Sequence, residues 1–254
     1  MKIVINPQYS DAFADFVRSV PAVFARGGEQ IYRSRNVIKI FDVGGTRLCV
    51  KSYKEPIFIS RVAYTFFRPS KASRAYFNAL EVLARGFETP APVAYIEEKR
   101  GGLLSKSYFI CLECPYPTDV RHFEHTEKYS VEDREILRLV GKLSAQLHER
   151  EVLHLDFSPG NILYQKIGGD CHFSLLDINR MKFCKVNLRE GCRNFQRLRG
   201  SDEMFGILAQ GYARERGFDE KICTELILKY NKEHVIYLNK RRKFKQRWKK
   251  LRKK

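Results

Sequence analysis

The chain has 254 residues, of which 44% are hydrophobic and 13% aromatic, a composition typical of a folded globular protein and not of a disordered one. No run approaches the roughly 18 apolar residues of a membrane-spanning helix. The N-terminal stretch lacks the apolar region of a signal peptide, so we expect a cytoplasmic protein. The net charge of +18 indicates an anionic partner, either a membrane surface or nucleic acid.

The first part of the chain predicts a helix followed by three strands. Ser10 and an apolar stripe at helical spacing predict a helix that ends at Pro21. Segments rich in Ile, Val, Tyr and Phe predict strands over 30–35, 37–41 and 46–53. The two glycines of residues 42–45 suit a hairpin turn. No Lys-Ser/Thr follows them, so this turn is not a phosphate loop of the P-loop kind.

Lys51 ends the third strand, where a lysine either snorkels at a sheet end or holds a ligand. The aromatic and basic segment 57–67 either packs under the first lobe or cradles a lipid. A helix capped by Ser70 and two further strands complete this half; their expected ranges are 71–85, 93–98 and 106–113. Two prolines in CPYPTD then suit a connector between lobes.

Seven cysteines at irregular spacings fit reduced thiols. Cys111 and Cys114 form a lone CxxC pair. A zinc site would need a second pair of ligands, for which His122 and His125 are a weak candidate. We favour the alternative, two cysteines in or beside a buried strand.

The second half predicts a mostly helical lobe. An apolar face over 131–150 predicts a long helix. The loop HLDFSPGNILY follows at 154–164, and then a short hairpin around residues 168–170. Residues 201–233 are expected to be helical.

Three features in this order match the needs of phosphoryl transfer. Lys51 ends a strand, His154, Asp156 and Asn161 share a loop after a long helix, and Asp177 follows two apolar residues. The reaction needs a lysine for the phosphates, oxygen ligands for magnesium and an acceptor for the substrate's proton. HxDxxxxN followed by a distal Asp is the kinase arrangement. Taken alone, the loop is an ordinary polar loop and Asp177 an ordinary turn aspartate.

At this point the chain resembles the protein-kinase-like superfamily and, more closely, the Kdo/WaaP family of lipopolysaccharide kinases. Four segments, together within residues 28–235, carry the resemblance: RPSKASRAYFNALEVLARGFETPAPVAYIE (68–97), LHEREVLHLDFSPGNILY (147–164), LLDINRMKF (175–183) and GSDEMFGILAQGYARERGF (200–218). It implies an α+β, bilobal protein-kinase-like fold, with a small antiparallel N-lobe sheet and a mostly helical C-lobe. The expected division is 1–114, 115–239 and a basic tail over 240–254.

The resemblance also implies roles for the loop residues. Asp156 resembles the catalytic base, and His154 resembles a structural residue that orients the loop. Asn161 and Asp177 resemble the magnesium ligands. ATP and Mg²⁺ are therefore the expected cofactors.

For the nucleotide, Lys51 resembles the phosphate-binding lysine, and the connector that includes Glu113 would meet the adenine. The helix glutamate that should pair with Lys51 is missing, because Phe77 stands at its expected position. Glu81 lies one turn later on the same helical face and could replace it. The alternative is a surface Glu81 with Phe77 in the core.

Three departures from protein kinases shape the expected function. Ser158, Pro159 and Gly160 stand where protein kinases place a cation after the catalytic Asp, which favours a sugar or another small molecule as acceptor. No glycine follows at 177–180 (DINR), so the loop has less backbone freedom and Asp177 is expected to hold one orientation. A glycine-rich cover loop is also missing, which leaves Arg33 and Arg35 or backbone amides to contact the phosphates.

The tail 240–254 holds eleven Lys or Arg and no acid. On a helix, Phe244, Trp248 and Leu251 share one face among cations, the pattern of an interfacial helix. We expect it to bind an anionic membrane surface, each cation contributing on the order of 1 kcal/mol. Nucleic-acid binding, which we consider the less suitable reading, and a solvated tail are the alternatives.

The resemblance, together with these features, implies an ATP-dependent kinase of an inner-core lipopolysaccharide sugar, Kdo before heptose, peripheral on the cytoplasmic face of the inner membrane. Two other functions remain open. One is a soluble small-molecule kinase or an atypical kinase associated with RNA. The other is a pseudokinase that serves as a binding module, which Phe77 and the missing glycine loop would suit.

Overall fold

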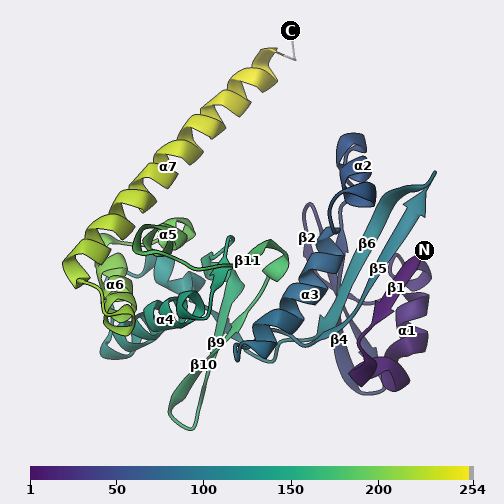
Figure 1. Ribbon diagram of the computed structural model, residues 1–254, viewed down its shortest axis with the longest axis horizontal. Helices are drawn as coiled ribbons and strands as arrows, with labels where there is room; N and C mark the ends of the chain where they lie inside the picture. Colours follow the sequence, from purple (N-terminus) through teal and green to yellow (C-terminus); the bar gives the residue numbers. More distant parts are fainter. Residues whose placement is uncertain (252–254) are drawn as a thin grey trace. The chain divides into compact units, whose positions relative to one another are not determined.

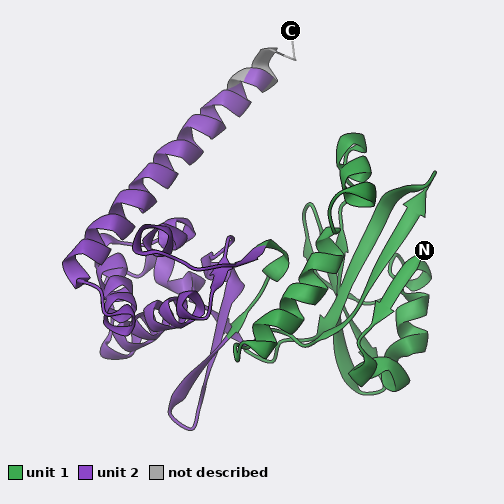
Figure 2. Ribbon diagram, viewed as in Figure 1, with its two compact units in different colours: residues 1–116, 174–180 green, residues 117–173, 181–254 purple. Residues whose placement is uncertain are grey.

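The computed structural model describes the backbone of residues 1–251 and the side chains of all of these except 247 and 249–251. It divides into two compact units (Figure 2): unit 1 is Met1–Tyr116 with Ser174–Arg180, and unit 2 is Pro117–Phe173 with Met181–Lys254. The first boundary lies two residues beyond the expected one at 114/115. Asp177, expected in the second lobe, belongs to unit 1 because residues 174–180 pack there.

Unit 1 is built on a six-stranded antiparallel sheet of order β1-β5-β6-β4-β3-β2. The strands are β1 (Lys2–Ile5), β2 (Glu29–Arg33), β3 (Val37–Val43), β4 (Thr46–Tyr53), β5 (Pro92–Arg100) and β6 (Leu103–Leu112). The helices are α1 (Ser10–Val23), α2 (Phe58–Phe66) and α3 (Lys71–Ala84), with a short 3-10 turn η1 (Pro7–Tyr9) before α1. Figure 1 shows α1 and α3 on opposite faces of the sheet.

The two sheet faces follow from the alternation of side chains along each strand. Val50 and Ile110 belong to the core cluster beneath α1. Their neighbours Lys51 and Phe109, which face each other across β4 and β6, therefore point to the face that α3 covers. This alternation places Lys51 on the same sheet face as α3.

The prediction that the first helix ends at Pro21 is wrong, because α1 continues to Val23 with Pro21 inside it. Proline removes its own N–H from the helix, and its ring crowds the carbonyl four residues earlier. Val17, Val20 and Phe24 are buried against the sheet on the same side, so packing maintains the last turn. Segment 57–67 forms α2, which has no buried residue.

Unit 2 is mostly helical. Its helices are α4 (Val131–Glu149), α5 (Leu188–Asn194), α6 (Asp202–Arg216) and α7 (Glu220–Leu251), with 3-10 turns η2 (Val120–His125), η3 (Pro159–Asn161) and η5 (Phe195–Arg197). Two small sheets accompany them: β8 (Val152–His154) with β11 (Met181–Phe183), and β7 (Thr118–Asp119), β9 (Ile162–Ile167) and β10 (Asp170–Leu175), the last continuing into unit 1. The remaining turn, η4 (Ile178–Arg180), belongs to unit 1.

The segment 201–233, expected to be helical, consists of two helices. Gly217 takes a left-handed φ of 64° and ends α6, a conformation that glycine adopts without steric cost. α7 then runs from Glu220 to Leu251 and includes the described part of the basic tail. Cys223, Ile227 and Tyr230 bury its first turns. Within the described residues, no helix is long and apolar enough to cross a membrane.

Candidate active site

In unit 1, Lys51 and Asp177 form a half-buried ion pair. The Lys51 Nζ lies 2.8 Å from Asp177 Oδ1, and the side-chain exposures are 14% and 31%. Asn179 Nδ2 donates to the same oxygen. The Lys51 ammonium also lies 5.4 Å from the centre of the Tyr53 ring. Because the pair is partly shielded from solvent, the Lys51 ammonium group and the Asp177 carboxylate are held next to each other.

The backbone around Asp177 is tied to unit 1 on both sides. Leu175 N donates to Glu88 O at 2.9 Å, and the Thr89 hydroxyl donates to Leu175 O at 2.7 Å. Asn78 on α3 donates to Ile178 O at 2.7 Å. Asp177 itself has a left-handed φ of 50°, a conformation in which Asp and Asn are enriched among non-glycine residues. These contacts hold the carboxylate on Lys51 without the glycine that kinases usually place nearby.

The structure does not bring Glu81 to Lys51, so the expectation of that pair is wrong. Glu81 Oε1 lies 2.7 Å from Arg85 Nε, one turn further along α3. Phe77 is 53% exposed and packs its ring edge-on against Tyr95. The physical reason is the rotation of α3, which turns Asn78 toward residues 177–180, while Asp177 supplies the carboxylate for Lys51.

Glu113 follows β6 and pairs with Arg47 on β4. Hydrogen bonds to Glu113, and secondly to Glu29, raise the pKa of the exposed Arg47. The Glu113 backbone N–H donates to Arg47 O at 2.9 Å. Its carboxylate therefore stabilises the end of the sheet, at the start of the connector expected to meet the adenine. Cys111 of the CxxC pair is buried on β6 opposite Cys49.

In unit 2, the loop between β8 and β9 is closed by its own hydrogen bonds. His154 is fully buried, and its Nδ1 accepts from the Asp156 backbone N–H at 3.1 Å. Asn161 Nδ2 donates to Asp156 O at 2.9 Å. Asp156 is therefore fixed from both ends of the motif, His154 before it and Asn161 after it.

Arg197 on η5 supplies the cation that the loop lacks. Its Nε lies 3.1 Å from Asp156 Oδ1. No spacing in the sequence pointed to Arg197, because it lies on a separate element. Asn194, at the end of the preceding helix α5, donates to His154 O at 2.8 Å. The segment 194–197 thus holds the loop at its backbone and at its carboxylate.

A buried network supports Asn194. Its Oδ1 lies 3.2 Å from His148 Nε2, and His148 Nδ1 lies 3.0 Å from the Tyr212 hydroxyl. Because Asn194 Nδ2 donates to His154, its Oδ1 is the acceptor and His148 Nε2 carries the proton. Arg216 donates to the Tyr212 oxygen at 3.2 Å, which leaves the Tyr212 proton for His148 Nδ1. His148 is therefore neutral, and its burial lowers its pKa to about 4.

Each unit, taken by itself, offers an oxygen atom that suits magnesium. Magnesium prefers oxygen ligands and is held by one or two carboxylates together with substrate phosphates. Asn161 uses its Nδ2 inside the loop, so its amide oxygen is the atom suited to a metal. Asp177 is a carboxylate beside a lysine. Among the described residues, no three His, Cys, Asp or Glu side chains gather to hold a metal by themselves.

An antiparallel N-terminal sheet with a supporting helix, a helical second unit and this HxDxxxxN loop define a protein-kinase-like phosphotransferase. The model of the lipopolysaccharide kinase (Kdo/WaaP) family matches residues 29–230. The chain therefore belongs to this family of lipopolysaccharide kinases, for which ATP is the expected phosphate donor.

Solved structures show the same fold. A structure titled "WaaP in complex with acyl carrier protein" matches with a TM-score of 0.60 and 16% sequence identity, covering 95% of this chain and 98% of that one. At this identity the likeness shows the fold alone. No curated protein matches the sequence.

Proposed function

We propose that this protein transfers the γ-phosphoryl group of ATP to a hydroxyl of an inner-core lipopolysaccharide sugar, Kdo in preference to heptose, at the cytoplasmic face of the inner membrane. The observation that carries the proposal is the Lys51–Asp177 pair at 2.8 Å, which joins a phosphate-binding cation to a carboxylate suited to a metal. Membership of the lipopolysaccharide kinase family supports the acceptor class.

The residues divide the chemistry among them. Asp156 orients the sugar hydroxyl and accepts its proton as the hydroxyl oxygen bonds to the γ-phosphorus. The bond between that phosphorus and the ADP oxygen breaks, and ADP leaves. Lys51 holds the α- and β-phosphates, while Asn161 and Asp177 supply oxygen ligands. The magnesium ion, when bound, neutralises charge that develops on the phosphates.

Asp156→Asn tests the base role directly. Phosphate transfer to Kdo–lipid A is measured for wild type and variant, with Asp170→Asn, in the exposed β9–β10 turn, as the matched control. We expect Asp156→Asn to lose roughly 10²- to 10⁴-fold in turnover and the control to keep wild-type turnover. Wild-type turnover in Asp156→Asn would remove Asp156 from this role. If the wild type phosphorylates a heptose-containing acceptor and not Kdo–lipid A, heptose takes the place of Kdo in this proposal.

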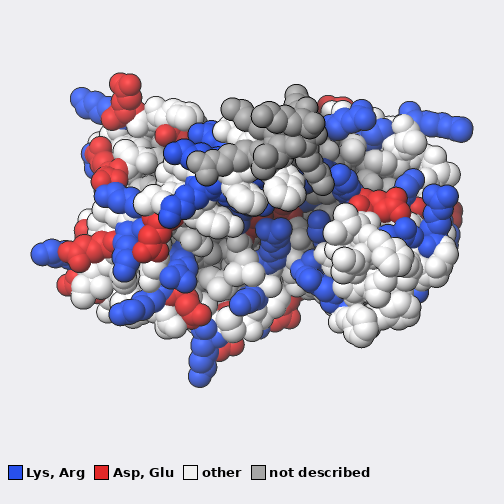
Figure 3. Space-filling view, turned by 90° about the horizontal axis from the view of Figure 1, so that it is seen from above, with Lys and Arg blue, Asp and Glu red and all other residues white. Residues whose placement is uncertain are grey.

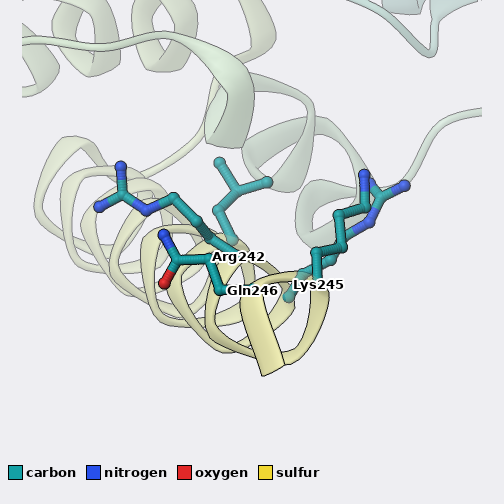
Figure 4. A pocket seen from close by; sticks show the side chains of 5 residues that line it. Arg242, Lys245 and Gln246 are labelled. Atoms are coloured by element: carbon teal, nitrogen blue, oxygen red, sulfur yellow. The ribbon is translucent and has the colours of Figure 1, made fainter. Parts of the chain in front are cut away.

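The described part of the tail supports attachment to an anionic membrane. Phe244 and Trp248 are 66% and 53% exposed, and their rings stack at 6.3 Å on one side of α7. A hollow on the same helix is lined by Leu238, Arg241, Arg242, Lys245 and Gln246. Figure 4 shows the side chains of Arg242 and Lys245 splaying in different directions from this helix. The described part of the tail thus combines cations with exposed aromatic rings, which suits an interface between water and lipid.

Removing residues 240–254 tests this attachment. We expect the full chain to sediment with vesicles of phosphatidylglycerol and phosphatidylcholine, and the 1–239 chain to sediment much less. Vesicles of phosphatidylcholine alone are the control for charge. Equal sedimentation of both chains would contradict a membrane role for the tail, and tighter binding to RNA than to vesicles would favour a nucleic-acid partner.

A further inference from the structure

Unit 1 gathers five basic residues, of which only Arg35 is among the residues expected to contact the nucleotide phosphates. Lys71 and Arg74 lie one turn apart at the start of α3. Arg68 precedes that helix, and its guanidinium lies 5.2 Å from the Tyr64 ring centre. Arg180 ends η4, which packs against α3, and Arg35 lies in the turn between β2 and β3. We call these five residues the cation cluster.

The members of the cluster lie close enough to repel one another. Burial, and then the charges of Arg180, Arg35 and Arg74, lower the pKa of Lys71, while Asp177 acts in the opposite sense. Burial also lowers the pKa of Arg74, on which Arg68 and Arg180 act in the same direction and Tyr64 and Tyr53 in the opposite one.

Among the described residues, four of the five cations are not neutralised by a carboxylate. Within the described part of the chain, no carboxylate forms an ion pair with Arg35, Arg68, Lys71 or Arg74. The first turn of α3 has no acidic residue, although cations are unfavourable at a helix N-terminus. Arg74 Nε is buried without a hydrogen-bond partner. Half-buried cations in such a place cost stability in the absence of an anion.

Asp177 is the carboxylate whose charge acts on Lys71. Its Oδ1 already accepts from Lys51 and Asn179. The cluster therefore lies beside the phosphate residues but is additional to them. Along the chain it continues into an apolar surface: Phe66 and Phe67, directly before Arg68, are 67% and 82% exposed, and Phe58 and Ile59 of α2 are 68% and 77% exposed. Arg61 donates to Leu104 O at 2.9 Å and anchors α2 on β6. Cations next to exposed aromatics match an anion that carries acyl chains.

We propose that the cation cluster is a binding site for an anionic group of the lipid-linked acceptor, a phosphate monoester or a sugar carboxylate. The cations position the acceptor beside Asp177, and they act on binding rather than on the nucleotide. This inference rests on the proposed function for the identity of the acceptor. It adds a recognition site that neither the loop motif nor Lys51 provides.

The test uses Lys71→Ala and Arg74→Gln in the full chain, with Arg18→Gln, an exposed arginine on α1, as the matched control. Binding of Kdo–lipid A in the presence of Mg-ADP is measured apart from transfer, and Mg-ATP binding is measured without acceptor. We expect each cluster variant to weaken acceptor binding and raise the acceptor KM by about tenfold. Mg-ATP binding should stay within about twofold of wild type.

The outcomes separate the two proposals. Unchanged acceptor binding in both variants overturns the cluster site even if the wild type phosphorylates Kdo–lipid A. Loss of Mg-ATP binding in the variants also overturns it, because the cluster would then belong to the nucleotide. If acceptor binding depends on the cluster but the wild type transfers no phosphate, the proposed function is contradicted and the cluster remains an acceptor-binding site. Folding is checked by thermal unfolding, in which both variants should match or exceed the wild-type Tm because repulsion is removed.

Two modified acceptors identify the anion. If the cluster binds a lipid phosphate, removing the phosphates from Kdo–lipid A should weaken binding to the wild type as much as Lys71→Ala does. If it binds the sugar carboxylate, only conversion of that carboxylate to an amide should do so. Full-strength binding of both modified acceptors would exclude an anion as the recognised group.

Discussion

At the scale of single residues, the carboxylate expected to be the catalytic base takes its cation from outside its own loop. Arg197 reaches Asp156 from η5 at 3.1 Å, whereas Ser158, Pro159 and Gly160 leave the loop without a basic side chain. A Cβ at Gly160 would meet the end of the flexible, exposed Arg121 side chain, which can move aside.

We predict that Arg197→Gln lowers turnover with little change in the ATP KM. A hydrogen bond between charged groups contributes about 1.5–3 kcal/mol, so the loss should be roughly 10- to 100-fold. Arg197→Lys should recover part of it, because the charge remains. Steady-state kinetics of both variants separate turnover from KM. An Arg197→Gln enzyme that turns over like wild type would show that the pair does not position Asp156.

His148 adds a pH dependence at the same scale. Its folded-state pKa of about 4 lies below the ordinary value of 6.5. The unfolded chain therefore binds this proton more readily than the folded one. The stability that a neutral His148 provides is fully present above about pH 6.5 and decreases as the pH falls toward 4. Protonation would also disturb the bond to Asn194, which holds the loop backbone.

The expected loss between pH 7 and pH 5 from this residue is about 2 kcal/mol of unfolding free energy. Urea unfolding at the two pH values measures it, and His148→Gln should remove most of the difference. His125→Gln, an exposed histidine, is the control and should behave like wild type. The same pH dependence in His148→Gln as in wild type would assign the effect to other groups.

At the scale of elements, two glycines determine how closely α4 and α6 pack. A Cβ on Gly141 of α4 would collide with Leu208 O, and a Cβ on Gly211 of α6 would collide with Arg138 O. Tyr212, next to Gly211, is fully buried and bonds His148. The close approach of the two helices therefore places the support of the catalytic loop.

We predict that Gly141→Ala and Gly211→Ala each destabilise the fold by about 1–3 kcal/mol, because backbone atoms cannot move aside easily. Gly206→Ala is the matched control, because a Cβ at Gly206 of α6 meets no atom within 4 Å. It should stabilise by up to about 1 kcal/mol through helix propensity. Chemical denaturation measures all three. Equal effects on stability at the three positions would mean that α4 and α6 pack less closely than described.

At the scale of the whole molecule, the main feature is the long, basic and largely exposed helix α7. The chain carries a net charge of +18, and Figure 3 shows Lys and Arg spread over one face with Asp and Glu among them. α7 buries its beginning in unit 2 and exposes the described side chains from Val235 to Trp248. In Figure 1 the later turns of α7 extend beyond the other helices of unit 2. An exposed helix of this kind gains little from the protein's own core and is suited to an external surface.

We predict that Phe244→Ser with Trp248→Ser weakens binding to anionic vesicles by about tenfold or more, since each large side chain contributes 1.5–3 kcal/mol when fully buried. Val131→Ser with Ile222→Ser, both exposed in unit 2 outside the tail, is the control and should bind like wild type. Raising the salt should weaken binding of every chain. If the aromatic variant binds as tightly as wild type, the tail attaches by charge alone.

The sequence by itself determined the parts that depend on local spacing. The cap at Ser70 and the HxDxxxxN motif are properties of short segments, so both could be predicted from the sequence, and the family resemblance that the motif helps to carry predicted the fold class. The pairing of Lys51 with Asp177 instead of Glu81, the arrival of Arg197 at Asp156 and the gathering of the cation cluster were decided only by the tertiary structure. Each of these contacts depends on the rotation of a helix or on residues distant in the chain, and the spacing of residues along the sequence predicts neither.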